Sequence, residues 1–485
     1  MQTLNKQMWK GYQEYPEKVL QFGTGNFLRA FTDWMVHEMN QKTGFNGSVV
    51  AIQSTNSGTA DKINSQDGLY TLYLQGIVDG VPRRNHEVIH SISRALNVNR
   101  DYDEYMKLAE SPDMRFVVSN TTEAGIVFAE KDRLGDRPPQ SFPAKLAAFL
   151  HHRFQFFQGD REKGLYIIPC ELIDRNGERL KEIILQYART WDLGADFSNW
   201  IEEANYFCNS LVDRIVPGFP KDEMNNIRRE LGYKDSLIVV GEQYHLWAIE
   251  GPESLKEEFP AEAAGLNVKV VKDLAPFRES KVYILNGAHT GMTPVAYLYG
   301  IDTVGEAMEN IVVRRFIEGL IFEEVIPALD LPEAETKTFA EDVLARFSNP
   351  YVQHYLKSIA LNAMSKFRTR NLPMLLAYAE KYSRVPKRIS FSLAAWISFY
   401  KGKRGTEDIP LADDADILQW FEALWKECDR TDAGLEKVVQ RVLGNERLWG
   451  RNLNEVPGLL ETTASFLISI EKDGMGSALE RSGFE

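Results

Sequence analysis

Short apolar runs alternate with amphipathic stretches through the first half of the chain. The runs are rich in β-branched residues and do not alternate cleanly with polar ones, which is typical of strands buried on both faces of a sheet. Strands that alternate with helical patterns predict βαβ units and a mostly parallel sheet. The predicted strands are residues 18–22, 48–52, 115–119, 164–169 and 237–240, and the helical patterns between them include residues 27–39 and 102–109.

The pattern changes near residue 273. A last strand is predicted at residues 268–271, and almost every later segment has the periodicity of an amphipathic helix. We therefore predict an α/β domain over residues 1–272 and a mostly α-helical domain over residues 273–485. Its predicted helices are residues 281–298, 304–326, 335–346, 350–365, 390–400, 417–427 and 435–442.

The composition narrows the class of protein. Of 485 residues, 44% are hydrophobic and 26% are charged, which is ordinary for a soluble globular protein. The net charge of −13 disfavours a general nucleic-acid binder, because the phosphate backbone would repel it. The three cysteines form no C-x-x-C pair, and no apolar run approaches the ~20 residues that cross a bilayer. The N-terminus also lacks the apolar core of a signal peptide. We expect a cytoplasmic protein with a small-molecule partner and leave its oligomeric state open.

The first predicted strand runs into the sequence G-T-G-N-F at residues 23–27, where a helix is predicted to begin. In such a turn the first glycine permits a tight bend, the second lets the backbone approach a pyrophosphate, and the helix N-terminus attracts its charge. Leu28 replaces the third glycine of the G-x-G-x-x-G motif, so a turn that merely needs two glycines also fits. The α/β context favours dinucleotide binding, with Gly23, Gly25, Asn26 and Phe27 as candidate contacts.

Polar residues follow the next two strands of the predicted sheet. The second strand is followed by neither a carboxylate nor an arginine, so the residues do not choose between NAD and NADP. The third strand is followed by Asn120 and Thr122. Ligands bind at the carboxyl ends of parallel strands, so both residues are candidate cofactor contacts, although a capped turn fits equally well.

The segment of residues 273–290 carries the clearest chemical signal. Lys281 lies in an otherwise apolar stretch and is followed by Asn286 and His289. On an ideal helix with about 100° per residue, His289 lies about 80° and Asn286 about 140° around the axis from Lys281. A lysine in an apolar site can exchange a proton, an amide can stabilise an alkoxide, and an imidazole can orient a hydroxyl. This set suits alcohol–ketone interconversion, and a surface lysine beside a core histidine is an equal alternative.

A second motif, H-E-x-x-H at residues 86–90, is that of zinc proteases. Its chemistry needs both histidines on one face of a helix. The β-branched residues that follow His86, with Pro82 just before, predict a strand instead, in which the two histidines are too far apart to share a zinc ion. We therefore expect no metal.

Three ordered motifs resemble those of the long-chain polyol dehydrogenases, the mannitol dehydrogenase family. The spacing K-x-x-x-x-N-x-x-H of residues 281–289 is similar to the family signature, residues 209–217 (NSLVDRIVP) to its N-S-x-V-D-R-I-x-P, and the glycine turn comes first, as in the family. The resemblance covers almost the whole chain. It implies a Rossmann-type domain that binds NAD(H), a helical substrate domain, and catalysis in the cleft between them without a metal.

The resemblance also implies roles for individual residues. Lys281 would be the general acid/base, Asn286 would donate to the carbonyl oxygen, and His289 would position the substrate. Val212 and Asp213 would lie near the nicotinamide.

Further segments narrow the resemblance to a branch of the family that interconverts D-altronate and D-tagaturonate with NAD(H) in hexuronate breakdown. They are QFGTGNFLRAFTDW, SNTTEAGI, IIPCELIDRNG, LNGAHTGMTPVA, IDTVGEAM and SKFRTRNLP. Because this substrate carries a carboxylate, the site needs a cation, and arginine binds carboxylates with two parallel hydrogen bonds. Arg368 and Arg370 are the candidates, against the alternative of a solvated basic helix end.

One position departs from the family pattern. Polyol dehydrogenases often carry an asparagine two residues after the position of Cys170, as a second oxyanion donor. This chain has Leu172 there, after Glu171, and Asn176 is a candidate replacement. Glu171 and Asn176 are therefore expected near the substrate.

Three other functions stay open. Fructuronate reduction and mannitol 2-dehydrogenation would use the same catalytic residues on a different substrate. A non-catalytic sensor of nucleotides or sugar acids would not need an intact acid/base set, and turnover of the cofactor separates it from an enzyme.

Overall fold

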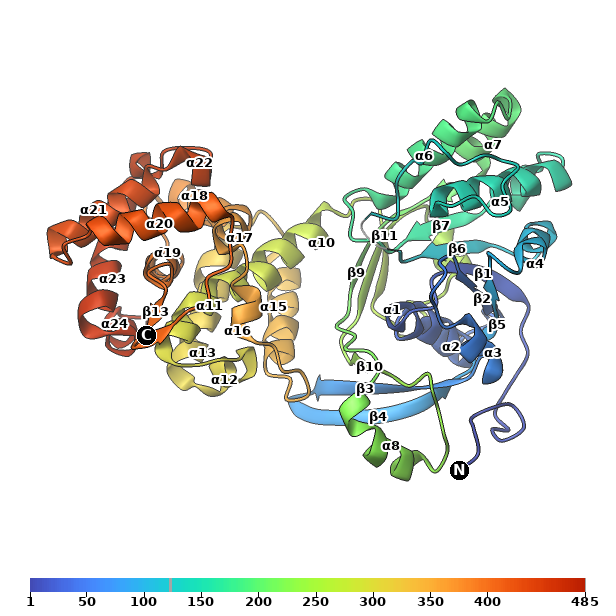
Figure 1. The fold of residues 1–485 in the computed structure, drawn as a ribbon, viewed down its shortest axis with the longest axis horizontal. Coiled ribbons are helices and arrows are strands. Elements are labelled where there is room, and N and C mark those ends of the chain that lie inside the picture. Colours follow the sequence, from blue (N-terminus) through green and yellow to red (C-terminus); the bar gives the residue numbers. More distant parts are fainter. Residues whose placement is uncertain (122–123, 485) are drawn as a thin grey trace. The chain divides into compact units, whose positions relative to one another are not determined.

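The structure, a computed structural model, describes residues 1–121 and 124–484. Its internal contacts divide the chain into two compact units. The first is Met1–Val78 with Arg83–Leu274, and the second is Asp79–Pro82 with Ala275–Glu485. Figure 1 draws the first unit mainly in blue to green and the second mainly in yellow-green to red. No helix in the described parts of the chain is both long enough and apolar enough to span a membrane.

A six-stranded sheet forms the centre of the first unit, and all its neighbouring strands are parallel. Because β2 and β6 flank β1, the strand order reverses there. Such a switch point opens a crevice at the carboxyl ends of the strands, where ligands bind. The predicted parallel sheet and its first four predicted strands are confirmed. The strand order is β5 (Ile92–Asn97), β2 (Ser48–Gln53), β1 (Glu17–Phe22), β6 (Phe116–Ser119), β7 (Tyr166–Pro169) and β8 (Tyr206–Phe207).

Helices bury both faces of this sheet, which explains why its strands are continuously apolar. Val19 of β1 belongs to one core cluster, whereas its neighbour Leu20 belongs to another. The first cluster includes residues of α2 (Thr32–Lys42), and the second includes residues of α5 (Phe142–Phe156) and α6 (Asn176–Thr190). Successive side chains of a strand point to opposite faces, so both must be apolar. The remaining helices of this unit are α1 (Asn26–Arg29), α3 (Ala60–Ser65), α4 (Tyr102–Lys107), α7 (Ala195–Ala204), α8 (Met224–Leu231) and α9 (Leu255–Glu258).

Two three-stranded sheets complete the first unit. One has the order β10 (Val239–Glu242), β3 (Tyr70–Val78) and β4 (Val81–Ile89), and the other β12 (Val268–Val271), β11 (Leu246–Glu250) and β9 (Asn209–Asp213). The predicted strand at residues 237–240 corresponds to β10, but it pairs with β3 instead of extending the parallel sheet. A buried apolar run does not encode the sheet that it joins.

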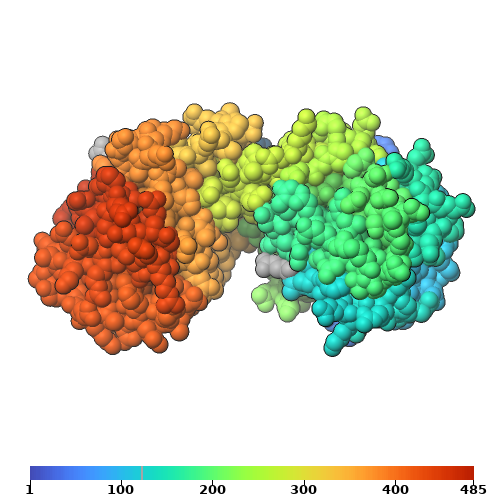
Figure 2. Space-filling view, turned by 90° about the horizontal axis from the view of Figure 1, so that it is seen from above, coloured from blue at the N-terminus to red at the C-terminus, as the bar shows by residue number. Residues whose placement is uncertain are grey.

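The second unit is mostly helical, as predicted, and its buried side chains form one core cluster. Residues 390–484, in orange to red, gather in one part of this unit in the space-filling view (Figure 2). At the centre of this unit α11 packs against α19, nearly all of which is buried. The helices are α10 (Ala275–Glu279), η4 (Ser280–Asn286), α11 (Gly287–Tyr299), α12 (Val304–Glu309), α13 (Ile311–Gly319), η5 (Leu320–Val325), α14 (Ile326–Ala328), α15 (Glu333–Phe347), α16 (Leu356–Ile359), α17 (Ala363–Arg370), α18 (Leu372–Tyr382), α19 (Lys387–Phe399), α20 (Ala415–Glu427), α21 (Asp432–Leu443), α22 (Glu446–Trp449), α23 (Leu459–Asp473) and α24 (Met475–Arg481).

The predicted helix at residues 350–365 is wrong over its first part, because α16 begins only at Leu356. The backbone before α16 pairs with another segment instead. Thr303 and Tyr355 form an isolated antiparallel bridge, and the Val304 N–H donates to the His354 carbonyl over 2.9 Å. Tyr355 is extended, with φ −75° and ψ 130°, so the backbone cannot be helical there.

Candidate active site

The glycine turn leaves room for a ligand at the carboxyl end of β1. Gly23 has φ +134°, and a Cβ there would lie 2.8 Å from Cδ1 of Leu28 and 3.3 Å from the Asn120 carbonyl oxygen. Gly25 precedes α1 in extended conformation, and nothing lies within 4 Å of its Cβ position. The first glycine is therefore required by the backbone, and the second borders open space. This cradle fits a pyrophosphate and the free N–H groups that would bind it.

Buried polar side chains support the turn from below. Gln21 donates to the Gly23 carbonyl and to the Asp33 carboxylate, each over 3.2 Å. Arg29 donates to the Asn26 side chain over 2.7 Å, and its own carbonyl accepts from the Tyr70 hydroxyl over 2.5 Å. These contacts orient Asn26 in the exposed part of the turn. The neighbouring candidate, Phe27, stacks on Phe31 with 5.0 Å between ring centroids.

The ends of β6 and β7 are joined through Glu171. Its carboxylate accepts from the Ser119 hydroxyl over 3.0 Å and from the Thr121 N–H over 2.9 Å. Asn120 donates to the Cys170 carbonyl over 3.1 Å. The predicted cofactor residue Asn120 thus lies beside Gly23 at the switch point, with Glu171 in the loop behind it. The other candidate of this loop, Thr122, lies outside the described residues.

Asn176 is buried and its side-chain amide is fully used inside the protein. It donates to the carbonyls of Pro169, Glu171 and Ser210, each over 3.0 Å, and its oxygen accepts from Gly177 N and Ser210 N. An amide has only two N–H bonds, so none is left for a substrate. The predicted role of Asn176 as replacement oxyanion donor does not fit this geometry, which instead ties β7 to β9. Leu172 is exposed.

Val212 and Asp213 lie on β9, where both are buried and pair with β11. The next residue of the motif, Arg214, is also buried. Its guanidinium donates to the Ala30 carbonyl over 2.6 Å and to the Glu242 carbonyl over 2.9 Å. Because Ala30 directly follows α1, the motif is connected to the glycine turn.

Lys281 and Asn286 lie on a π-helical segment, not on an ideal α-helix. The segment η4 spans Ser280–Asn286. A π-helix closes i→i+5 hydrogen bonds, so residues five positions apart lie close to one line along the axis. The angle of 140° expected for an α-helix between Lys281 and Asn286 is therefore wrong, and η4 brings the two side chains to the same side. The amide of Asn286 is half-buried and has no hydrogen-bond partner among the residues that the structure describes.

His289, in the first turn of α11, is held as a neutral imidazole. Burial, and then the positive charges of His354, Arg346 and Arg370, lower its pKa well below the ordinary value for histidine. Its ring donates to the Leu285 carbonyl, whereas Nε2 is buried without a hydrogen-bond partner in the described structure. In a neutral ring the second nitrogen is an acceptor, so Nε2 can accept a hydrogen bond from a substrate hydroxyl.

Side chains from other helices hold the first turns of α11. Pro294 has no N–H to donate to the Thr290 carbonyl, four residues earlier, and the Trp396 indole donates to it instead over 3.0 Å. The side chain of Asn371 donates to the Gly287 carbonyl over 3.0 Å. These two residues thus fix the backbone on either side of His289.

The two predicted carboxylate-binding arginines lie in different surroundings, although both belong to α17. Arg370 is half-buried, and its guanidinium donates to the Thr290 hydroxyl over 3.1 Å. Arg368 is exposed and lines a different pocket, with Asp414, Asp416 and Arg447. The structure therefore brings Arg370, and not Arg368, to the segment that carries His289.

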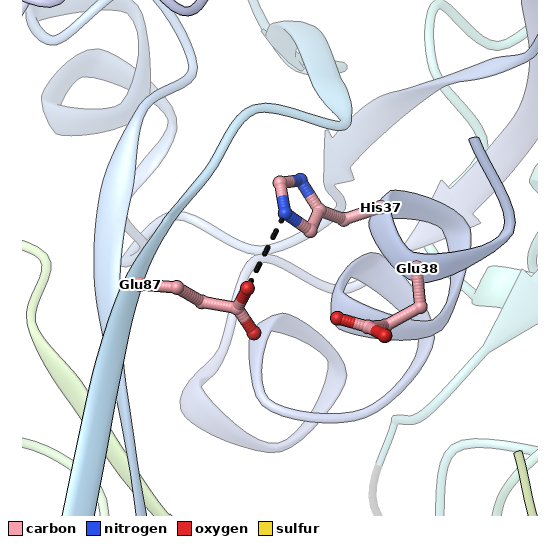
Figure 3. A group of neighbouring side chains, drawn as sticks. All are labelled: His37, Glu38 and Glu87. Carbon is pink, nitrogen blue, oxygen red and sulfur yellow. Dashed lines mark ion pairs between the residues drawn. The ribbon is translucent and has the colours of Figure 1, made fainter. Parts of the chain in front are cut away.

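The zinc-protease motif lies on β4 up to Ile89, so the predicted strand is confirmed, and His90 directly follows it. Its Glu87 meets His37 of α2 at 3.5 Å, and Glu38 lies close by (Figure 3). All three groups already have partners: Lys42 pairs with Glu38, Gln41 contacts His37, and Trp34 donates to Glu87. The contacts describe a polar network between α2 and β4. That the protein uses no metal stays a prediction.

Three residues of this site were not predicted: His354, Asn371 and Trp396. The proline inside a helical pattern was a usable signal, since it leaves the carbonyl four residues earlier without a donor. It could not say which side chain supplies that donor. His354 carried no signal, because its segment was expected to be helical.

Comparison with known proteins assigns both parts of the chain to one family. Residues 17–262 match the mannitol dehydrogenase Rossmann domain, and residues 273–470 match the mannitol dehydrogenase C-terminal domain. The chain belongs to the mannitol dehydrogenase family. This family member is 53% identical over 481 residues to the altronate oxidoreductase of Bacillus subtilis (strain 168), covering 99% of this chain and 98% of the relative. It is 46% identical to the altronate oxidoreductase of Yersinia enterocolitica, covering 99% of both.

Solved structures share the fold of this mannitol dehydrogenase family member at lower identity. A D-sorbitol dehydrogenase in substrate-free form has a TM-score of 0.79 at 21% identity, covering 98% of this chain and 100% of the other. The Pseudomonas fluorescens mannitol 2-dehydrogenase, solved as a ternary complex with NAD and D-mannitol, has a TM-score of 0.64 at 21% identity and covers 99% of both chains. The α/β unit is thus a Rossmann domain, as expected.

Proposed function

We propose that this protein interconverts D-altronate and D-tagaturonate with NAD(H), acting on a secondary alcohol. The observation that carries the proposal is the set of groups on one helical segment: Lys281 and Asn286 on η4, His289 on α11, and Arg370 beside them. Full-length identity of 46–53% to altronate oxidoreductases supports the same substrate pair. The protein is proposed to act in the cytoplasm, where its three free cysteines stay reduced.

The first unit supplies the cofactor site in this proposal. The turn of Gly23 and Gly25 would hold the pyrophosphate with Asn26 and Asn120 beside it, and Val212 and Asp213 would contribute to the nicotinamide side of the site. When bound, NADH supplies the hydride that reduces the ketone carbon of the substrate. The buried contacts of Gln21 and Arg29 hold the turn in place before the cofactor binds, so little ordering is left to be done on binding.

The second unit supplies the proton and the contacts to oxygen. In the direction of reduction, the Lys281 ammonium donates a proton to the carbonyl oxygen as that oxygen becomes a hydroxyl. In oxidation, the neutral amine takes the proton back. The Asn286 amide donates an N–H to the same oxygen and stabilises its developing charge. Nε2 of His289 accepts a hydrogen bond from a substrate hydroxyl next to the reacting carbon and so fixes the position of the substrate.

Arg370 accounts for a carboxylate on the substrate. Its guanidinium makes one hydrogen bond to the described part of the protein, to Thr290, so further N–H groups remain for a ligand. A half-buried guanidinium binds a carboxylate more strongly than an exposed one, because water competes less. A neutral ketose would leave this cation unpaired, which favours a sugar acid.

The test is the loss of NADH absorbance with D-tagaturonate, D-fructuronate and D-fructose offered in parallel to the purified protein. Rapid loss with tagaturonate alone is expected. Preference for fructuronate or fructose would overturn the substrate while keeping an acid/base role for Lys281. No turnover with any of them, nor with NADPH, would overturn the enzymatic function and leave a sensor.

A further inference from the structure

A second imidazole lies beside His289 in the helical unit. The rings of His354 and His289 are 4.9 Å apart between centroids and meet edge to face, at 68°. On another side, His289 packs against Phe347 at 4.3 Å. His354 is half-buried, and its ring nitrogens have no hydrogen-bond partner in residues 1–121 and 124–484. Polar groups that are partly buried normally have a hydrogen-bond partner. The ring nitrogens of His354 are therefore available to a bound ligand.

The backbone around His354 is tied down although its ring is not. The His354 carbonyl accepts from the Val304 N–H, and the Leu356 N–H donates to the Asp302 carbonyl, each over 2.9 Å. The partner segment is itself fixed, because Thr303 and Glu306 form a capping box at the start of α12. The ring is thus presented from a rigid segment, which suits a binding residue better than a mobile loop would.

Positive charge lies around His289, the neighbour of His354. Arg346 of α15 and Arg370 of α17 both act on the same neighbour, His289, and oppose its protonation. Asp342 of α15 lies near Arg346, and an anion bound beside Arg370 would gain a favourable charge interaction there as well. A carboxylate is the anion that the proposed substrate brings.

We propose that His354 is a specificity-determining residue that donates an imidazole N–H to the carboxylate of the sugar acid, next to Arg370. This inference rests on the proposed function for the identity of the substrate. It assigns His354 no part in proton transfer to the reacting carbon or oxygen, so its loss weakens binding of the acid and spares the chemical step.

The pH dependence of binding should follow from this contact. Burial lowers the pKa of His354 from its ordinary value, and a bound carboxylate would raise it again. Binding of a sugar acid should therefore take up a proton and weaken as the pH rises. The charged and titratable groups near this place are His289 of α11, Asp342 and Arg346 of α15, and Arg370 of α17.

The experiment compares the wild type with His354→Gln and measures KM and kcat for D-tagaturonate and the inhibition constants of D-gluconate and D-sorbitol. These two inhibitors have the same chain length and differ in a carboxylate. In His354→Gln we expect KM for tagaturonate and the inhibition constant of gluconate to rise about tenfold, as for loss of one charge-assisted hydrogen bond. The constant of sorbitol and kcat should change less than about twofold, and the rise of KM with pH should flatten.

The matched control is His152→Gln, which removes a half-exposed histidine that pairs with Glu110 in the other unit. NADH binding to both variants verifies that they are folded, and His354→Asn is a second variant should the glutamine fail to fold. Equal effects on gluconate and sorbitol, or none on either, would overturn the role of His354. A wild type that does not reduce tagaturonate would overturn the proposed function instead, and direct binding of gluconate and sorbitol, measured by calorimetry, would still test His354.

Discussion

Single side chains at this site take their chemistry from their neighbours. Burial and the neighbouring His354, Arg346 and Arg370 lower the pKa of His289, and its bond to the Leu285 carbonyl leaves Nε2 as the acceptor. Arg368 and Arg370 have the same chemistry and belong to one helix, yet one is exposed and the other half-buried. The type of residue sets what a group can do, and its surroundings decide whether it does so.

Replacement of Lys281 by methionine should abolish most of the turnover. The variant keeps the volume of the side chain and loses the group that exchanges the proton, so kcat should fall about 100- to 10,000-fold. NADH binding should be unchanged, because the cofactor residues are in the other unit. Stopped-flow absorbance gives kcat, and fluorescence titration gives NADH affinity. Lys337→Met, at an exposed lysine paired with Glu333, is the control, and near-normal turnover of Lys281→Met would refute the acid/base role.

Substitution of the two arginines of α17 should separate their roles. Arg370→Ala removes a half-buried guanidinium and should raise KM for tagaturonate by about 10-fold or more, the effect of losing about 1.5–3 kcal/mol of charge-assisted hydrogen bonding. Arg368→Ala removes an exposed one and should have a much smaller effect. Steady-state kinetics on both variants measures these changes in KM. A larger effect at Arg368 would mean that the carboxylate binds in the other pocket.

Secondary structure elements position these side chains through departures from ideal geometry. The π-helical η4 brings together residues five apart, and Pro294 opens the hydrogen-bond ladder of α11 at Thr290. Each departure leaves backbone groups that need partners from elsewhere. Trp396 of α19 and Asn371, at the junction of α17 and α18, supply them.

Trp396→Phe should test whether the proline break is structurally supported. The variant keeps an aromatic side chain, although a smaller one, and removes the N–H, so the buried Thr290 carbonyl loses its donor at a cost of about 1–3 kcal/mol in unfolding free energy. Because Thr290 follows His289, KM should also rise. Urea unfolding and kinetics measure the two effects. Trp425→Phe, which removes a similar bond to the Ile397 carbonyl, should destabilise the protein without altering KM. A Trp396→Phe protein with wild-type stability would contradict the argument.

Across the molecule, each unit contains a buried carboxylate that favours the protonated form. Burial raises the pKa of Asp33 in the first unit and of Glu324 in the second to about 7, although hydrogen bonds from Gln21 to Asp33 and from the backbone of Arg388 and Ile389 to Glu324 act against it. The Asp33 carboxyl accepts from Gln21, which supports the glycine turn. The Glu324 carboxyl accepts from the backbone N–H groups at the start of α19.

The free energy of unfolding should therefore depend on pH in a defined direction. A carboxyl whose pKa is higher in the folded than in the unfolded state contributes stability below its ordinary pKa of about 4 and loses it as the pH rises to about 7. Each group should account for a loss of up to about 3 kcal/mol over that window. Asp33→Asn and Glu324→Gln should each flatten this part of the pH profile of urea unfolding. The exposed Glu333→Gln should leave it unchanged, and profiles parallel to the wild type would refute the shifted pKa values.

The order of elements and most candidate residues were readable from the chain alone. Apolar runs of four to six residues predict buried strands, and a G-x-G after the first of them predicts the cofactor turn, because both depend on interactions close in sequence. The spacing of Lys281, Asn286 and His289 is equally local. The helix at residues 350–365 could not be predicted correctly, since the pairing with Thr303 and Val304 that prevents it involves residues about 50 positions away.

Local pattern thus determined the fold class and which residues are candidates for the chemistry. Tertiary structure decided the rest: that β10 joins another sheet, that the amide of Asn176 is used up by three carbonyls, that Arg370 rather than Arg368 lies beside His289, and that His354 does too. The physical reason is that apolar periodicity records only whether a side chain is buried. Partners, charge environment and hydrogen-bond demand arise when distant segments pack together, and no short stretch of sequence encodes them.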